Sequence, residues 1–148
     1  MSKSSQVPYE TTIHVRDTCL CLHVQRAARA LARHFDDALR GVGLTHGQFS
    51  LMMALNRPKP PTMGEVSQVL AMDRTTLTAN LKPLERRGLV AVGIDEKDRR
   101  SRRVALTAEG EAVLAAATPI WIASHAEIDA RLGADKADDL RAMLIALS

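Results

Sequence analysis

The chain has 148 residues, of which 46% are hydrophobic and 25% charged, and its formal net charge is +3. This length suits one domain with a substantial core, and because only 3% of residues are aromatic, aliphatic side chains must build that core. No apolar run approaches the roughly 20 residues that span a bilayer, and the first residues lack the apolar centre of a secretory signal. We therefore expect a cytoplasmic protein without membrane contact, whose two cysteines stay reduced.

The first half of the chain predicts two helices. A flexible arm is expected for residues 1 to about 12, followed by a long amphipathic helix from about Val15 to Arg40. Its apolar stripe consists of Leu20, Val24, Ala27, Ala28, Leu31, Phe35 and Leu39. Thr45 and Gln48 then have the spacing of a capping box, and the almost wholly apolar run after them predicts a helix at the centre of the core.

A helix-turn-helix pattern begins at Thr62. Thr62 and Glu65 form a second capping box, so a helix begins near Met63, and Asp73 is a good N-cap for the next helix. That helix places Leu77, Leu81 and Leu84 on one face and Thr75, Thr78, Lys82 and Arg86 on the other. Pro83 lies inside it and costs about 3 kcal/mol in a helix interior. The apolar spacing continues nevertheless, which predicts a bent helix that ends near Arg87.

A hairpin with a basic tip follows. Gly88 ends the helix, residues 89–92 and 104–106 have the composition of strands, and the charged segment between Asp95 and Arg103 predicts the turn. From Arg74 to Arg103 there are nine Lys or Arg residues against four Asp or Glu residues. Threonine hydroxyls suit base edges and phosphates, and cations neutralise phosphates. The order of elements therefore predicts a winged helix-turn-helix that binds duplex DNA, whereas the helix face taken alone is more typical of a solvated surface.

Two more amphipathic helices are predicted after the hairpin. Thr107 caps a helix of about six turns that Pro119 kinks and Gly133 ends, and Asp135 caps a last helix. The last helix carries Leu140, Met143, Leu144 and Leu147 on one face. Burial within the monomer and burial in a subunit interface explain these stripes about equally well.

Several strings resemble the MarR (multiple antibiotic resistance regulator) family of winged-helix repressors. They are residues 44–49 (LTHGQF), 73–78 (DRTTLT) and 84–90 (LERRGLV), together with Asp98-Arg-Arg100 before Val104-Ala-Leu-Thr107 and Gly110. The resemblance covers nearly the whole chain and implies a mainly α fold with a small β-hairpin wing. Within a single domain, residues 1–148, it implies a DNA-binding region at about 45–106 and dimerisation helices at about 13–42 and 107–148.

The resemblance also implies functional residues. The helix from Arg74 would lie in the major groove, and Arg100 would enter the minor groove at the wing tip, oriented by a salt bridge from Asp98. The DNA-binding residues expected are Arg74, Thr75, Thr76, Thr78, Lys82, Arg86, Asp98, Arg100 and Arg102. A homodimer would bind a pseudo-palindromic operator with half-sites about one DNA turn apart.

Two signals are candidates for releasing such a repressor. The first is a small phenolic or aromatic acid, held by Arg16, His23 or His46 near an apolar floor. The second is an organic hydroperoxide that oxidises Cys21, which matches the reactive position of the peroxide-sensing branch. That branch supports its thiolate with tyrosines, whereas Gln25 and Phe35 occupy those positions here, and a buried structural thiol is the commoner role of such a cysteine.

Other classes of function have less support. The chain contains no phosphate-binding glycine loop, nucleophile elbow or metalloprotease motif, so we expect neither an enzyme nor a cofactor. Cys19, Cys21 and His23 do not share one helical face, which argues against a metal site. An architectural DNA-binding protein without a switch remains an alternative to the repressor.

Overall fold

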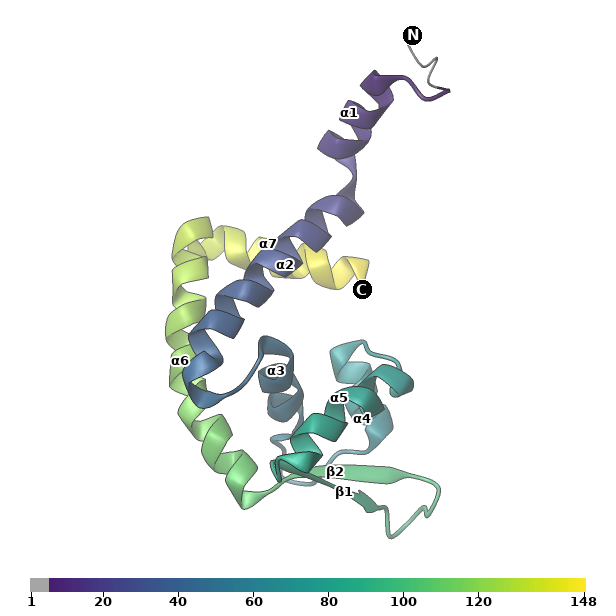
Figure 1. Cartoon of the computed structure of the whole chain (residues 1–148), viewed down its shortest axis with the longest axis vertical. Coiled ribbons are helices and arrows are strands. Elements are labelled where there is room, and N and C mark those ends of the chain that lie inside the picture. Colours follow the sequence, from purple (N-terminus) through teal and green to yellow (C-terminus); the bar gives the residue numbers. More distant parts are fainter. Residues whose placement is uncertain (1–5) are drawn as a thin grey trace. The chain divides into compact units, whose positions relative to one another are not determined.

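The computed structural model describes residues 6–148 and is mainly helical with a two-stranded hairpin (Figure 1). The elements are α1 (Tyr9–Thr18), α2 (Leu20–Leu39), η1 (Arg40–Val42), α3 (His46–Leu55), α4 (Met63–Leu70), α5 (Arg74–Arg86), β1 (Val90–Ile94), β2 (Arg102–Leu106), α6 (Ala108–Leu132) and α7 (Ala134–Leu147). The η1 element is a single 3-10 turn. This order confirms the predicted mainly α fold with a hairpin wing.

The chain divides into two compact units between His34 and Phe35. The first unit contains α1 and most of α2, and the prediction of one continuous helix from Val15 to Arg40 is wrong there. Cys19 interrupts the helix with an extended backbone (φ −68°, ψ 110°), and its Sγ accepts a hydrogen bond from the N–H of Leu22 at 3.5 Å. The thiol thus satisfies one of the free N–H groups at the start of α2.

The prediction of a flexible arm for residues 1 to about 12 is wrong for its last residues. Helix α1 begins at Tyr9, so the last part of the arm is helical, while residues 1–5 lie outside the described residues. No side chain of α1 is buried. The reason for the error is that helix α1 has only weak amphipathic spacing, which is the pattern on which the prediction relied.

The core of the second unit is centred on α3, as predicted. Phe49, Leu51, Met52 and Leu55 of this helix are all buried. At its start, the Thr45 hydroxyl accepts a hydrogen bond from the N–H of Gln48 at 3.2 Å, and the Gln48 side chain accepts one from the N–H of Thr45 at 3.1 Å. The capping box is confirmed, and it fixes where the buried helix begins.

Helix α6 packs against this core through an aromatic cluster. The Trp121 ring stacks on Phe49 and on Phe35, with centroids 5.8 Å and 6.3 Å apart, and lies 4.8 Å from the ring of His125. Trp121 follows Pro119, and α6 continues through that proline for its full length. The predicted continuation of the helix beyond Pro119 is therefore confirmed.

The last helix begins differently from the prediction. Gly133 occupies the N-cap position of α7 and no side chain caps it, so the assignment of Asp135 as N-cap is wrong. Asp135 lies in the first turn instead, where its negative charge still suits the positive end of the helix dipole. The predicted apolar face is present but exposed, from 38% for Leu140 to 66% for Leu147.

A close approach of α6 to the preceding loop joins the hairpin to the core. The Thr107 hydroxyl donates a hydrogen bond to the carbonyl of Gly88 at 2.5 Å and accepts one from the N–H of Gly110 at 3.0 Å. Gly110 is buried against the carbonyl of Leu89, and a Cβ at this position would overlap that carbonyl oxygen. Glycine is therefore required here by space rather than by backbone conformation.

We expect Gly110→Ala to lower the free energy of unfolding by about 1–3 kcal/mol, because the added methyl group must displace backbone. Gly47→Ala is the matched control, since Gly47 lies in the first turn of α3 with open space around it and alanine favours helix. Urea unfolding of the two variants measures the difference. Equal stability of Gly110→Ala and the wild type would contradict the close approach.

Candidate nucleic-acid interface

Helices α4 and α5 with the hairpin β1–β2 form a compact group, which we call the reading head (Figure 1). The Thr62 hydroxyl accepts a hydrogen bond from the N–H of Glu65 at 3.2 Å, and the Glu65 carboxylate accepts one from the N–H of Thr62 at 3.1 Å. This confirms the second capping box. Val66 and Leu77 anchor the two helices in the core, with exposed fractions of 1% and 0%.

Asp73 starts α5, as predicted. Its carboxylate accepts hydrogen bonds from the N–H of Thr76 at 2.8 Å and from the Thr76 hydroxyl at 2.9 Å. These bonds stabilise the ionised form and lower the pKa of Asp73 below its ordinary value. The Thr76 hydroxyl is therefore used in the cap, although the sequence placed it among the residues that contact DNA.

The two faces of α5 separate as the sequence predicted. Leu77, Leu81 and Leu84 are buried. The residues expected to contact DNA from this helix are all exposed, namely Arg74, Thr75, Thr76, Thr78, Lys82 and Arg86. The helix continues through Pro83 to Arg86, which confirms the expected continuation and excludes a loop from Lys82 onward.

The hairpin is longer than expected. Strands β1 and β2 pair antiparallel from Val90 with Leu106 to Ile94 with Arg102. Each strand extends two residues farther toward the tip than predicted, and the turn spans residues 95–101. The missed residues are Gly93 and Ile94 in β1 and Arg102 and Arg103 in β2. Gly93 is of a type depleted in strands and the two arginines are charged, so only Ile94 favours a strand at these positions.

At the tip, Asp98 acts on the backbone. Its carboxylate accepts a hydrogen bond from the backbone N–H of Arg100 at 3.0 Å, and the N–H of Ser101 donates to the carbonyl of Asp98 at 2.9 Å. Among the described residues, no ion pair joins Asp98 to the Arg100 guanidinium, which corrects the predicted salt bridge. Asp98 shapes the turn and leaves the exposed Arg100 side chain available to a ligand.

Arg102 also has a structural contact. Its guanidinium donates a hydrogen bond to the carbonyl of Arg99 at 3.2 Å, so it closes the turn on its own strand. The side chain remains exposed. Its position suits a DNA contact only if that weak bond is exchanged for one to phosphate.

Arg103, which the sequence did not single out, ties the hairpin to the helices. Its guanidinium donates to the carbonyl of Pro60 at 2.6 Å and lies 3.3 Å from the Asp95 carboxylate. Its neighbour Val104 donates a backbone hydrogen bond to the carbonyl of Pro61 at 3.0 Å. The segment before α4 therefore adds a short bridge to β2, and the wing is fixed relative to the start of α4.

The Asp95 carboxylate is held in its ionised form. The backbone N–H of Lys97 donates to it at 3.1 Å, and this bond, followed by the Arg103 guanidinium, lowers the pKa of Asp95. Asp95 is 8% exposed. Its carboxylate thus holds both Lys97 in the turn and the arginine that ties the wing to α4.

The residues expected to hold an aromatic acid each have a local partner. Arg16 pairs with its neighbour Asp17 at 2.7 Å, and His23 Nδ1 lies 2.7 Å from the Cys19 carbonyl. His46 lies 2.9 Å from Asp36, whose pKa is lowered first by the hydrogen bond from the His46 backbone N–H. Arg16 and His23 belong to the first unit and His46 to the second, so the expected ligand site stays a prediction.

The thiols differ in exposure. Cys19 is half-buried at the helix break and Cys21 is exposed, with the Gln25 amide donating to its Sγ at 3.2 Å. Within residues 6–148, no group of three His, Cys, Asp or Glu side chains is arranged to hold a metal ion. The same residues include no helix long and apolar enough to cross a membrane.

Comparison with known proteins shows to which family this architecture belongs. Residues 42–101 match the sequence model of the MarR family. The crystal structure of the M. tuberculosis transcriptional regulator MosR in complex with DNA is 39% identical in sequence and has a TM-score of 0.80, covering 87% of this chain and 92% of MosR. The chain belongs to the MarR family.

Two other relatives extend this result. The transcriptional activatory protein BadR of Rhodopseudomonas palustris is 35% identical over 97 residues, which are 64% of this chain and 55% of BadR. The chain therefore matches only about half the length of this relative. The transcriptional repressor CouR bound to a 23-mer DNA duplex is 28% identical with a TM-score of 0.80, covering 97% of this chain and 99% of CouR. As a MarR-family member, the chain is a DNA-binding transcriptional regulator and not an enzyme.

We expect Asp95→Asn to lower stability at neutral pH, because the neutral amide binds Arg103 and the Lys97 N–H more weakly than the carboxylate does. Since the folded-state pKa of Asp95 is lowered, the carboxylate's contribution is fully present above the unfolded value of about 3.9. It is lost as the pH falls through the folded-state pKa.

Unfolding of the wild type and Asp95→Asn between pH 7 and pH 2.5 measures this dependence. The difference between the two proteins should be constant above about pH 5 and should shrink below pH 4. A difference that grows as the pH falls would contradict the role of the ionised carboxylate.

Proposed function

We propose that this MarR-family protein is a sequence-specific repressor that binds a pseudo-palindromic operator as a homodimer and is released by an aromatic-acid signal. The exposed polar face of α5 beside a wing tied to the start of α4 supports this proposal most strongly. In that arrangement, the helix and the wing tip are held in one rigid head. Fixed spacing between two contacts is what reading adjacent grooves of a duplex requires.

The proposed contacts follow from the exposed side chains of the reading head. Thr75 and Thr78 offer short hydroxyl groups to base edges from α5, and Lys82 on the same face suits a phosphate. Arg100 at the wing tip suits the minor groove, where a guanidinium reads width and potential more than base identity. The affinity should therefore depend on both elements, and the sequence preference mainly on α5.

A second copy of the chain is the proposed partner of the terminal helices. Met143 and Leu147 of α7 are 58% and 66% exposed, and Leu20 of α2 is 69% exposed. Apolar rows of this kind are costly in water and are typical of subunit interfaces. Two-fold pairing would place two reading heads on one duplex, which accounts for the expected palindrome.

We expect Arg100→Ala to weaken binding to the chain's own promoter palindrome by about tenfold or more, with two chains still bound per duplex. Lys82→Gln should lower the slope of log affinity against log salt by about one, because one phosphate contact is lost. Gel-shift titrations at several salt concentrations give both numbers. Arg141→Gln, which removes a guanidinium paired with Asp138 on α7, is the control.

Scrambled DNA in the same titrations separates the repressor from an architectural protein. The repressor should prefer the palindrome at physiological salt by a large factor. Equal affinity for both duplexes would contradict the proposed sequence-specific regulator and favour the architectural alternative. Unchanged affinity of Arg100→Ala would remove the wing from the mechanism.

The proposed signal is an aromatic acid, either free or as its coenzyme A thioester. A structure of CouR, 26% identical with a TM-score of 0.80, contains p-coumaroyl-CoA, and it covers 90% of this chain and 94% of CouR. Repression rather than activation is proposed because CouR is described as a repressor, although BadR is described as an activatory protein. Such a ligand would act by binding the DNA-free arrangement more tightly.

Oxidation of Cys21 is the second candidate signal, and one contact favours it. The Gln25 amide donates to the exposed Cys21 Sγ at 3.2 Å, from a position that the peroxide-sensing branch uses to support its thiolate. An amide N–H stabilises a thiolate by hydrogen bonding. The organic hydroperoxide resistance regulator of Bacillus subtilis is 28% identical over 91 residues, covering 62% of each chain.

Release of the protein from promoter DNA distinguishes the aromatic-acid signal from oxidation of Cys21. We expect an aromatic acid or its thioester to release wild type and Cys21→Ser equally, because the thiol is not part of that mechanism. Cumene hydroperoxide should release neither protein. Release of the wild type but not of Cys21→Ser by the hydroperoxide would contradict the ligand proposal and establish the thiol as the sensor.

A further inference from the structure

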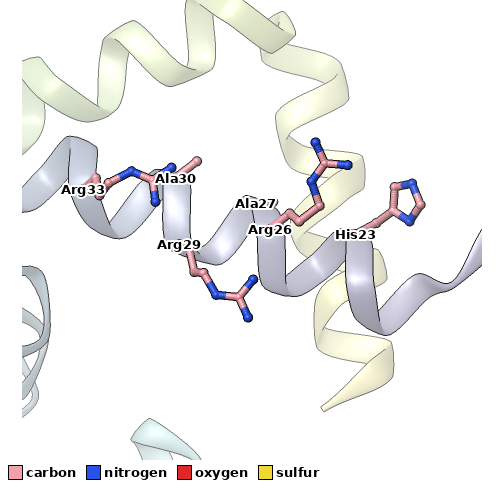
Figure 2. A pocket seen from close by; sticks show the side chains of 6 residues that line it. All are labelled: His23, Arg26, Ala27, Arg29, Ala30 and Arg33. Carbon is pink, nitrogen blue, oxygen red and sulfur yellow. The ribbon is translucent and has the colours of Figure 1, made fainter. Parts of the chain in front are cut away.

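Three arginines and a histidine line an open hollow along one side of α2. His23, Arg26, Arg29 and Arg33 line a cavity of about 610 Å³ together with two alanines, Ala27 and Ala30 (Figure 2). Their spacing places the four side chains along the same half of the helix. The two alanines have short side chains and leave room between the longer ones.

The charges of these arginines are not neutralised within the protein. Among the described residues, Arg26 and Arg33 have no ion pair, and Arg29 donates a hydrogen bond to the neutral Gln25 amide oxygen at 3.2 Å. The two acids of α2 are engaged elsewhere, Asp36 with His46 and Asp37 with Arg40 at 2.6 Å. We call Arg26, Arg29 and Arg33 the arginine row.

Such a row has an energetic cost without a ligand. Arg26 and Arg29 are three residues apart, and Arg29 and Arg33 are four apart, which are the spacings at which like charges on a helix repel. An anion bound between them removes that repulsion and gains charge-assisted hydrogen bonds. The row is therefore better explained by an anionic partner than by the stability of α2 itself.

The length of the row indicates what kind of anion fits. From Arg26 to Arg33 the helix rises about 10 Å, more than the width of one carboxylate or one phosphate. In Figure 2 the guanidinium groups of Arg26 and Arg29 extend in different directions, so they do not converge on a single small ion. A ligand with separate phosphate groups uses the whole row, and guanidinium is well suited to bidentate phosphate binding.

We propose that the arginine row of α2 binds the phosphate groups of coenzyme A, so that this regulator responds to an aromatic acyl-CoA thioester and not to the free acid. The inference rests on the proposed ligand-responsive function and names the part of the ligand that is selected. Coenzyme A carries a diphosphate and a separate 3′-phosphate, which supplies several anionic groups along one molecule. A free aromatic acid has one carboxylate and leaves most of the row unneutralised.

Calorimetry on the full chain at physiological salt tests this selection with benzoyl-CoA, 3′-dephospho-CoA, benzoate and ATP as probes. We expect benzoyl-CoA to bind at least tenfold more tightly than benzoate or ATP, with dephospho-CoA between them. Equal binding of ATP and benzoyl-CoA, or of benzoate and benzoyl-CoA, would overturn the assignment to coenzyme A.

Variants locate the binding. Arg29→Gln should weaken benzoyl-CoA binding about tenfold, and replacing all three arginines of the row with glutamine should weaken it at least a hundredfold. Arg40→Gln is the matched control, because its guanidinium is already paired with Asp37. Circular dichroism checks that each variant is folded, and Arg29→Lys, which keeps the charge but loses the planar fork, should fall between wild type and Arg29→Gln. Equal losses in Arg40→Gln and in the triple variant would overturn the site.

Gel shifts without ligand separate this inference from the proposed function. The triple variant should bind the promoter palindrome as tightly as the wild type and with the same salt slope. Weaker binding with a reduced slope would make the row a DNA contact and overturn the ligand site. If the wild type distinguishes the palindrome but does not bind benzoyl-CoA, only this inference fails. If it binds benzoyl-CoA but does not distinguish the palindrome, only the proposed DNA function fails.

Discussion

The attachment of β2 to the segment before α4 is the constraint on which the reading head depends. A two-stranded hairpin has little stability of its own, so a wing joined only through its strand ends would be free to pivot. Arg103 and Val104 prevent this by bonding to the carbonyls of Pro60 and Pro61. Asp95, the turn residue that directly follows β1, holds the same arginine. One side chain therefore fixes the wing with respect to the start of α4 and ties its two strands together near the turn.

The acidic and the basic residues of the reading head have different roles. Asp73, Glu65 and Asp98 satisfy backbone N–H groups, and that use lowers the pKa of Asp73. Their negative charges are thereby held in caps and turns, close to the backbone. The cations of α5 and of the wing tip have few such bonds and extend into solvent. The local surplus of positive charge is therefore presented outward, where a polyanion would meet it.

Local backbone chemistry explains which features the sequence predicted well. The capping boxes at Thr45 and Thr62, the cap at Asp73 and the buried face of α5 all follow from hydrogen bonds or spacings within a few residues. The break at Cys19 was missed because the apolar spacing of α2 gives no sign of where the helix begins. The Arg103 attachment was missed because it joins residues 43 positions apart. Contacts of that range depend on the tertiary fold and leave no periodic signal in the sequence.

Helix α2 presents an apolar stripe and an arginine row on opposite sides, so one helix can contact a second copy through one face and a ligand through the other. The stripe includes the exposed Leu20, Val24 and Leu31, which a second copy would cover. A ligand held by the row alters DNA affinity only if it binds the DNA-free arrangement of the dimer more tightly than the DNA-bound one. An anion on the face opposite the stripe meets that condition when a change in the packing of the two copies shifts α2 relative to the ligand's other contacts. The same helix would then contact the partner subunit and bind the ligand that changes the affinity of the dimer for DNA.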